Sequence, residues 1–260
     1  MENKQNELTI KPLSVGGTFL CFGIPTAIFA VGFYIIMPAL IEQKITPFNA
    51  YWISMGIPFI VMFCCSLIAF RMEGNPFVWK IFKDRYRIHY INGKTWLWAL
   101  LVFIATFLGY AIVSSSLQPL FNLGIIKLPA FLPAWLDPRT LQSVSAWDDA
   151  FGGLKGNWFA AISYLIFLFF NVVGEELWWR GYILPRQEVV LHKWTWVVHG
   201  LLWGCFHIFK WWDLPGIFIL TLALSYVVYR TKNTSLGIVL HFLGNSIAIV
   251  PILIGILKTN

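Results

Sequence analysis

The sequence places two adjacent carboxylates, Glu175 and Glu176, and the guanidinium of Arg180 in a stretch that is otherwise strongly apolar. A charged side chain inside a bilayer costs at least about 2.5 kcal/mol on insertion scales, so such residues rarely persist without a role. On a helix, Glu176 and Arg180 stand four residues apart and share a face, so we expect them to pair. Glu175 is rotated by about 100° from Glu176 and points elsewhere, which leaves it free for chemistry.

Three further polar side chains stand in apolar stretches nearer the C-terminus, namely His207, His241 and Asn245. Their depths follow from a helical rise of about 1.5 Å per residue, counted from the inner end of each stretch. On that count Glu175, His207 and Asn245 lie about 16–21 Å deep, and His241 lies one turn from Asn245 on the same face. We therefore expect four groups from three helices to converge within one band of the membrane.

These types of side chain can hydrolyse an amide bond without a serine or cysteine nucleophile. A carboxylate surrounded by apolar side chains is suited to take a proton from water near neutral pH. A neighbouring imidazole can orient that water or share the proton. A second imidazole and a carboxamide one turn apart can donate hydrogen bonds to a developing oxyanion. The pattern indicates a water-activating site.

Each of these residues also has a simpler structural explanation. The ion pair of the Glu-Glu-x-x-x-Arg segment can serve only to fix packing. His207 and Asn245 can make interhelical hydrogen bonds, and His199, which no motif supports, is interpreted as such a residue. Glu175 is the hardest to explain in this way, because no basic side chain within helical reach is left to pair with it.

The elements that must position these groups are long apolar helices. The chain has 260 residues, of which 58% are hydrophobic and 12% charged, so it is far more apolar than a soluble domain. Seven stretches are long enough, or nearly so, to cross about 30 Å of hydrocarbon: 14–41, 48–70, 95–116, 156–187, 194–211, 214–230 and 234–257. We expect an all-α, polytopic transmembrane helical bundle of about seven spans, or eight, forming a single integral membrane domain over residues 1–260.

The net charge of +7 is distributed as a topology signal and not as a nucleic-acid-binding surface. With the N-terminus inside and seven spans, 13 of the 19 lysines and arginines lie on the inner side. This asymmetry follows the positive-inside rule and predicts an N-in, C-out orientation. The basic stretch 71–94 is expected to lie against anionic lipid headgroups. Membrane lipid is thus the expected partner, and nucleic acid is not.

One connecting segment, residues 117–155, is unusually long and contains four prolines, an acidic pair and several large apolar side chains. Its aromatic and aliphatic content is typical of a segment that rests in the outer interface of a membrane. It could act as a lid or as a support for substrate, although most such loops only connect helices.

Taken in order, the polar motifs resemble those of the CAAX protease and bacteriocin-processing (CPBP) family of intramembrane proteases, also called the Abi family. That family's pattern is Glu-Glu-x-x-x-Arg, then Phe-x-x-x-His, then His-x-x-x-Asn. The corresponding residues here are Glu175-Glu176 with Arg180, Trp203 with His207, and His241 with Asn245. Tryptophan replaces the usual phenylalanine and keeps an aromatic wedge at that position. The resemblance covers about residues 156–250, the expected catalytic core.

The resemblance implies a role for each of six residues. Glu175 would activate water together with His207, while His241 and Asn245 would hold the oxyanion. The remaining two, Glu176 and Arg180, would support the site.

No cofactor or metal is expected, although the family was long treated as metal-dependent. A glutamate and two histidines can ligate zinc in principle. The sequence has no His-Glu-x-x-His motif, however, and hydrolysis by a glutamate-activated water explains the same residues without a metal. The four cysteines all lie in proposed spans, where thiols behave as small apolar groups, so neither a disulfide framework nor a zinc ribbon is expected.

The expected function is that of an intramembrane endopeptidase in the plasma membrane, a multi-pass protein that cleaves a membrane-associated peptide or protein. Processing of CAAX tails, leader peptides or pheromone peptides would each fit, and the sequence fixes neither the substrate nor the oligomeric state. The alternative is a non-catalytic membrane protein, such as a bacteriocin self-immunity factor or a regulatory scaffold. A transporter with a proton relay is a third possibility, but it would be supported by internal repeats or paired broken helices, which the sequence does not clearly show.

Overall fold

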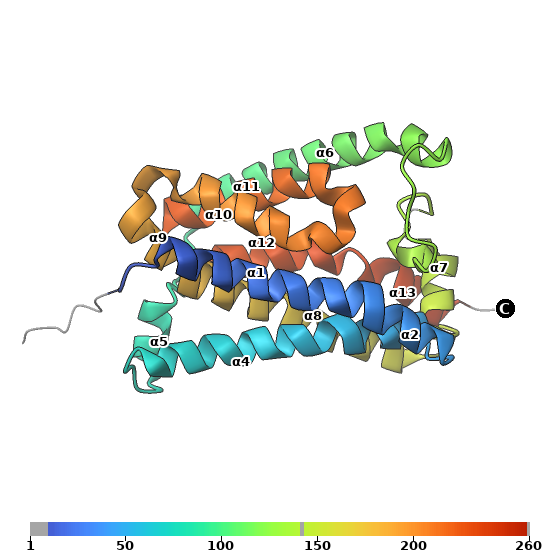
Figure 1. The fold of residues 1–260 in the computed structure, drawn as a ribbon, viewed down its shortest axis with the longest axis horizontal. Coiled ribbons are helices and arrows are strands. Elements are labelled where there is room, and N and C mark those ends of the chain that lie inside the picture. Colours follow the sequence, from blue (N-terminus) through green and yellow to red (C-terminus); the bar gives the residue numbers. More distant parts are fainter. Residues whose placement is uncertain (1–9, 141–142, 259–260) are drawn as a thin grey trace, which may run out of the picture.

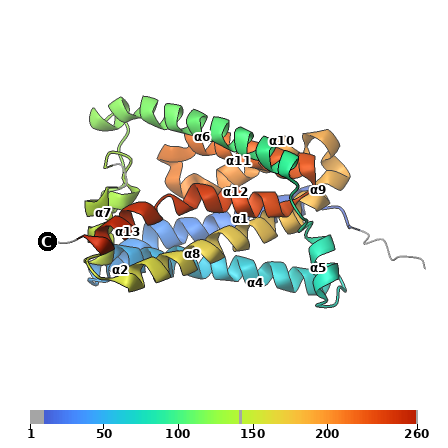
Figure 2. The same cartoon turned by 180° about the vertical axis from the view of Figure 1, so that it is seen from behind.

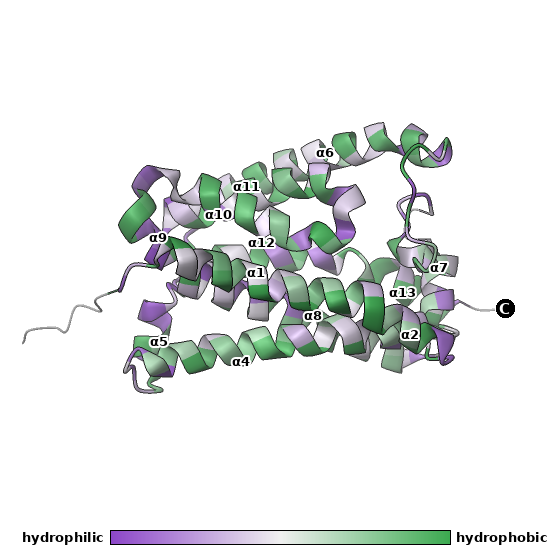
Figure 3. Cartoon of the chain, viewed as in Figure 1, coloured by the Kyte–Doolittle hydropathy of each residue, from purple (hydrophilic) through white to green (hydrophobic). Residues whose placement is uncertain are grey.

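The computed structural model describes residues 10–140 and 143–258, and within these ranges it consists of helices and connecting segments without a strand. The long helices run roughly side by side along the length of the molecule (Figure 1 and, from behind, Figure 2). Hydrophobic residues cover most of their length, and hydrophilic residues gather mainly towards the ends (Figure 3). The expectation of an all-helical, strongly apolar bundle is confirmed.

The N-terminal half contributes three long helical runs. The first joins α1 (Val15–Val31), η1 (Gly32–Ile36) and α2 (Met37–Glu42); the second joins α3 (Pro47–Tyr51), η2 (Trp52–Gly56) and α4 (Ile57–Met72); the third is α6 (Gly93–Asn122). Side-chain caps begin two of them, since Ser14 Oγ accepts from Gly17 N at 3.0 Å and Asn92 Oδ1 accepts from Thr95 N at 2.9 Å. Gly32 lets the first two runs touch, because a Cβ there would collide with the backbone of Ser54.

The C-terminal half carries the polar motifs. It consists of α8 (Trp158–Glu176), η4 (Leu177–Ile183), α9 (Leu184–Leu191), η5 (His192–Trp194), α10 (Thr195–Phe206), η6 (His207–Asp213), α11 (Leu214–Thr231), α12 (Thr234–Ser246) and α13 (Ile249–Leu257). The helix expected to continue from 156 through the Glu-Glu-Arg segment does so, but with a π-helical stretch at η4. A π-helix widens the turn and frequently marks a functional site.

The fifth predicted span differs from the structure. The helix expected over 194–211 ends at Phe206 and is followed by the 3₁₀ segment η6, within which Lys210 leaves helical geometry with φ −113° and ψ 49°. Helix α10 and helix α11, which has a proline in its first turn, form a hairpin whose turn stops short of the end of the bundle where α7 and α13 lie (Figure 1). Hydrophilic residues stand among hydrophobic ones in that turn (Figure 3).

Four helical runs are long and apolar enough to cross a membrane, and the bent pair α12–α13, with an angle of 43°, makes up to five among the described residues. The α10–α11 hairpin starts and finishes at the α9 end of the bundle (Figure 1). Because a hairpin returns to the side it left, counting it as two spans or as a re-entrant element does not change the orientation of the remaining helices. Seven spans and the N-in orientation stay predictions.

The segment 117–155 is more deeply packed than expected of a loop that rests in the interface. Its first residues belong to α6, which continues to Asn122, past the predicted end of that span at 116. It also contains η3 (Ala134–Leu136) and α7 (Val144–Phe151), and α7 lies beside α13 (Figure 2). Trp135 and Trp147 are buried and pack against each other, with ring centroids 4.7 Å apart and ring planes tilted by 33°. The two tryptophans therefore close the bundle from this end.

Candidate active site

The two carboxylates lie at the last turn of α8, where the helix passes into the π-helical η4. Glu175, Glu176 and Arg180 are all essentially inaccessible to solvent. Arg180 Nη1 lies 2.9 Å from Glu176 Oε1, which confirms the pair predicted from their spacing. The guanidinium also stacks on Trp203, with Cζ 3.4 Å from the ring centroid. A desolvated cation on an aromatic face gains more than an exposed one, so Trp203 helps to compensate the buried charge of Arg180.

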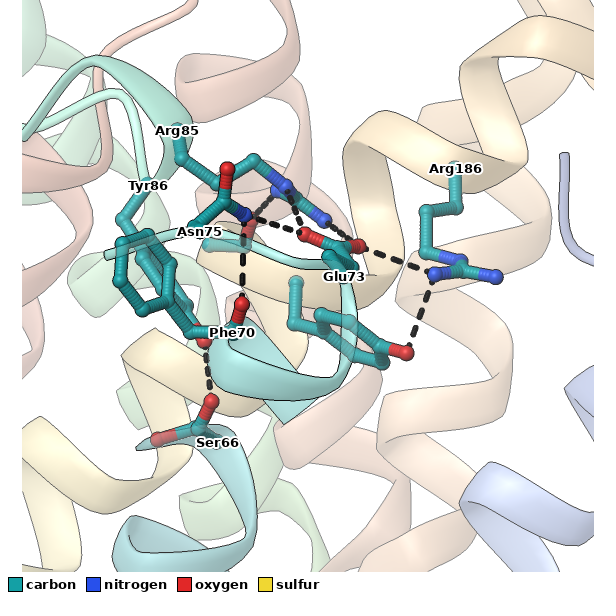
Figure 4. A network of polar contacts seen from close by, with 9 residues as sticks. Ser66, Phe70, Glu73, Asn75, Arg85, Tyr86 and Arg186 are labelled. Carbon is teal, nitrogen blue, oxygen red and sulfur yellow. Dashed lines mark hydrogen bonds and ion pairs between the residues drawn. The ribbon is translucent and has the colours of Figure 1, made fainter. Parts of the chain in front are cut away.

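A second ionic cluster, which we call the Glu73 network, holds η4 from outside (Figure 4). Glu73 accepts from Arg85 Nε and Nη2 at 2.6 Å each and from Arg186 Nη1 at 3.0 Å. Arg85 Nη1 also donates to the carbonyl of Gly181 at 3.0 Å, which ties α5 (Trp79–Arg85) to η4. Gly181 is required at this contact, because a Cβ there would overlap the ring of Tyr86.

Tyr86 fastens the same corner to α4. Its hydroxyl donates to the carbonyl of Ser66 in a short hydrogen bond (Figure 4). Burial raises the pKa of the Tyr86 phenol, so the group stays protonated and remains a donor. The turn that carries Arg180 is thus fixed on both sides, by Tyr86 packing and by the Glu73 network.

Glu175 is not the free carboxylate that its position suggests. Three neutral donors hold it: Asn171 Nδ2 at 2.9 Å from Oε1, with Trp203 Nε1 at 2.7 Å and Trp179 Nε1 at 3.2 Å from Oε2. Within residues 10–140 and 143–258, no lysine, arginine or histidine lies within ion-pair distance of it. Among the described residues Glu175 thus has no basic partner, as the sequence predicted. The sequence did not predict its three hydrogen bonds.

His241 and Asn245 connect the two carboxylates. His241 Nδ1 lies 3.0 Å from Glu176 Oε1, and Asn245 Nδ2 lies 3.1 Å from His241 Nε2. Asn245 Nδ2 also donates to Asn171 Oδ1 at 2.8 Å. The contacts close a ring, which we call the carboxylate ring: Glu175, Asn171, Asn245, His241, Glu176, Arg180, Trp203 and back to Glu175.

His207 caps the end of α10 beside this ring. Its Nδ1 lies 2.9 Å from the carbonyl oxygen of Trp203, which can only accept, so Nδ1 carries the proton. In the neutral imidazole, Nε2 is then left as an acceptor. His199 lies apart, fully buried with Nδ1 2.7 Å from Gln187 Oε1, in keeping with its structural interpretation.

A cavity of about 590 Å³ brings the predicted catalytic residues together. Its lining includes Glu175, His207, His241 and Asn245, whereas Glu176 and Arg180 stand behind it. Helix α6 forms one wall with an aromatic face, and Trp135 and Trp147 contribute to another. The rest of the lining is mainly aliphatic and aromatic, as expected of a site for an apolar ligand.

Sequence reasoning missed two groups of lining residues. Asn171 is a carboxamide one turn before Glu175 in an apolar run, and this signal was present in the sequence. The second group is Lys210, Asp213 and Tyr110, of which Tyr110 donates to the Asp213 carboxylate at 3.1 Å. Lys210 fell inside a predicted span and was overlooked there; it lies where η6 turns within the bundle.

The residues of this site do not form a metal centre. Among the described residues, no three His, Cys, Asp or Glu side chains are grouped so that they could hold a metal ion. The donors around Glu175 are N–H groups, which repel a cation.

Comparison with protein families matches the segment that carries this site to a known family. Residues 157–247 match the family described as type II CAAX prenyl endopeptidase Rce1-like. The chain carries an Rce1-like domain. No curated protein and no solved structure matches the chain.

The Rce1-like domain extends from the start of α8 to the end of α12 and contains all six predicted site residues. It confirms the family inferred from the three motifs. At the level of the family, the domain is that of a membrane-embedded CAAX protease, a peptide hydrolase. Helices α1 to α6 lie outside the match, although α6 forms a wall of the cavity.

Proposed function

We propose that this protein is an intramembrane endopeptidase in which Glu175 activates a water molecule to hydrolyse a peptide bond. The observation that carries the proposal is that Glu175 and His207 line one cavity, with a carboxylate and a free Nε2 as acceptors. A water molecule has two O–H bonds to give to these acceptors. No serine or cysteine takes part.

The reaction would proceed by direct attack of water on the carbonyl carbon. Glu175 takes the proton of the water as its oxygen bonds to that carbon, and the carbonyl electron pair moves to oxygen. Asn245, on the facing helix, stabilises this oxyanion by donating from Nδ2, and His241, one turn away, positions that amide. The C–N bond then breaks, and Glu175 returns the proton to the departing amine.

Glu176 and Arg180 act as supports in this scheme. Their ion pair stands behind the cavity, and Glu176 accepts from His241 Nδ1. With its proton held on Nδ1, His241 keeps one tautomer and one ring orientation. The buried ion pair therefore fixes the ring orientation of His241, which faces the cavity, and does not itself contact the substrate.

The substrate class follows from the setting of the cavity. Apolar helices surround it, so a membrane-associated peptide or protein fits better than a soluble one. A CAAX-type tail is the first candidate because of the family match, with leader or pheromone peptides beside it. We place the protein in the plasma membrane as a multi-pass enzyme in contact with lipid.

The proposal is tested by Glu175→Gln, which keeps the shape of the side chain and removes the base. Purified protein in detergent is given a quenched fluorescent peptide with a prenylated CAAX end, and in parallel an acyl-anchored peptide without one. We expect kcat to fall at least about 100-fold, the usual contribution of a general base. Glu42→Gln, at an exposed glutamate, is the matched control and should cleave normally.

Two results would overturn the proposal. Full cleavage by a normally folded Glu175→Gln variant would show that Glu175 is not the base. Cleavage of neither peptide by the unmodified protein would favour the alternative, a non-catalytic immunity factor or scaffold.

A further inference from the structure

Asn171 connects the proposed base to the proposed oxyanion donor, and no motif of the family resemblance includes it. Its side chain amide donates to Glu175 Oε1 at 2.9 Å, and its oxygen accepts from Asn245 Nδ2 at 2.8 Å. The side chain is 8% exposed, so it has little water to replace these partners. A change in the orientation of the Asn171 amide therefore changes the hydrogen bonds of both Glu175 and Asn245.

The ionised form of Glu175 fixes every hydrogen bond in this part of the carboxylate ring. A carboxylate only accepts, so Asn171 must present Nδ2 to Glu175 and Oδ1 to Asn245. Asn245 must then present Nδ2, whose second proton points to His241 Nε2 at 3.1 Å. His241 Nε2 must be unprotonated, and its proton lies on Nδ1, facing Glu176 at 3.0 Å. The orientations therefore follow from chemistry at each step.

In this arrangement the proposed oxyanion donors are all occupied. Both protons of Asn245 Nδ2 face acceptors, one on Asn171 and one on His241. The only proton of neutral His241 faces Glu176. A substrate carbonyl entering the cavity thus finds no free N–H on either residue until one of these bonds changes.

Proton uptake by Glu175 supplies that change. Glu175 Oε2 accepts from two indole N–H groups, which have no acceptor atom to present in their place. Glu175 Oε1 accepts from the Asn171 amide alone, which can flip and present its oxygen instead. The proton taken from water is therefore accommodated on Oε1, which becomes a donor. Asn171 then presents Oδ1 to Glu175 and Nδ2 to Asn245, and two N–H groups cannot face each other. The Asn245 N–H is turned towards the cavity as the oxyanion forms.

We propose that Asn171 is a positioning residue that orients Asn245 and, by reversing its amide, transfers an Asn245 N–H to the oxyanion when Glu175 accepts a proton. The inference rests on the proposed function and deepens it. No atom is gained or lost in this step: the water proton passes to Glu175 Oε1 and later to the amine, and the amide only exchanges hydrogen bonds. Asn171 itself does not take part in bond making.

The test is a double-mutant cycle on kcat, using the same prenylated CAAX peptide. We expect Asn171→Leu, which is nearly isosteric, to lower kcat about 10–100-fold with KM within about twofold. Asn245→Ala should lower kcat strongly in the native background. In the Asn171→Leu background it should cost at least about 10-fold less, because Asn245 is no longer placed by its partner.

A second cycle separates positioning from general loss of structure. Trp203→Phe removes an N–H from the other oxygen of Glu175, away from the amide link. Its effect should therefore multiply with that of Asn245→Ala. Phe169→Leu, on the exposed face of the same helix, should leave kcat within about twofold. If Asn171→Leu does not accumulate, Asn171→Ala replaces it in the same cycle.

The inference is overturned if Asn171→Leu is within twofold of the unmodified protein, or if Asn245→Ala costs the same in both backgrounds. Glu175→Gln is run alongside to keep the two proposals apart. An inactive Glu175→Gln with a fully active Asn171→Leu rejects only the role of Asn171. An active Glu175→Gln rejects the proposed function itself.

Discussion

Glu73 and Glu175 are carboxylates that each receive hydrogen bonds from three side chains, but the partners differ in charge. Glu73 is held by the guanidinium groups of Arg85 and Arg186 and by Asn75 (Figure 4). Glu175 is held by one amide and two indoles and faces a cavity. Two cations neutralise the charge of the first, whereas the second is held by neutral groups and lines a cavity in which it can meet water.

Burial and hydrogen bonding alone do not make a carboxylate a base. The Glu73 network spans α4, α5 and α9 and fixes the turn at η4, so its charges contribute to structure. The environment of Glu175 contributes to chemistry, because it combines an apolar cavity with neutral donors. Glu176 belongs with Glu73 in this respect, since Arg180 neutralises it.

The largest effect on stability is expected at Glu176. In Glu176→Gln the Arg180 guanidinium stays fully buried without a carboxylate, which costs about 3–5 kcal/mol when one partner of a buried pair is removed. Thermal unfolding in detergent measures it. The double variant Glu176→Gln/Arg180→Met should recover part of the loss, because a pair can be exchanged for apolar groups more cheaply than it can be broken. A double variant less stable than Glu176→Gln would contradict this.

Replacement of Glu73 is expected to cost less stability and to leave the rate of cleavage by the folded protein unchanged. Glu73→Gln leaves Arg85 and Arg186 with a neutral acceptor and should cost about 1–3 kcal/mol. The same unfolding assay measures it, and cleavage is then normalised to folded protein. We expect kcat per folded molecule to be unchanged within about twofold. A fall of more than 10-fold would give the Glu73 network a catalytic part and remove the contrast with Glu175.

Trp203→Phe should show the smallest of the three effects. It keeps the ring beneath Arg180 and removes only the N–H that lies 2.7 Å from Glu175. This hydrogen bond holds the Glu175 carboxylate in place, and the net value of a typical bond is about 0.5–1.5 kcal/mol, so its loss should lower kcat about 3–10-fold. Trp158→Phe, at an exposed position where α8 begins, is the matched control. Unchanged kcat in Trp203→Phe would mean that the indole acts only as an aromatic wedge.

The sequence was sufficient for contacts that depend on regular spacing. The pair of Glu176 and Arg180 follows from four residues on a helix, and the helical bundle follows from the length of the apolar runs. The convergence of Glu175, His207, His241 and Asn245 on one cavity was also anticipated from depth. Each of these rests on periodicity, which is a local property.

What the sequence did not reveal depends on side-chain direction and on long-range packing. Trp203 was expected to be an aromatic wedge, but its N–H bonds to Glu175, a residue 28 positions away. Asn171 received no role from the sequence, because only the fold places Asn245 of α12 beside it. The end of α10 at Phe206 was missed because hydrophobicity continues past it.

One side-by-side measurement compares the two carboxylates directly: kcat per folded molecule and thermal stability of Glu175→Gln and Glu73→Gln, with the same peptide and detergent. We predict a Glu175→Gln protein that is folded but at least about 100-fold slower. We predict a Glu73→Gln protein that is less stable but fully active once folded. The reverse pattern, with Glu175→Gln active and Glu73→Gln folded but inactive, would contradict the assignment of Glu175 as the base.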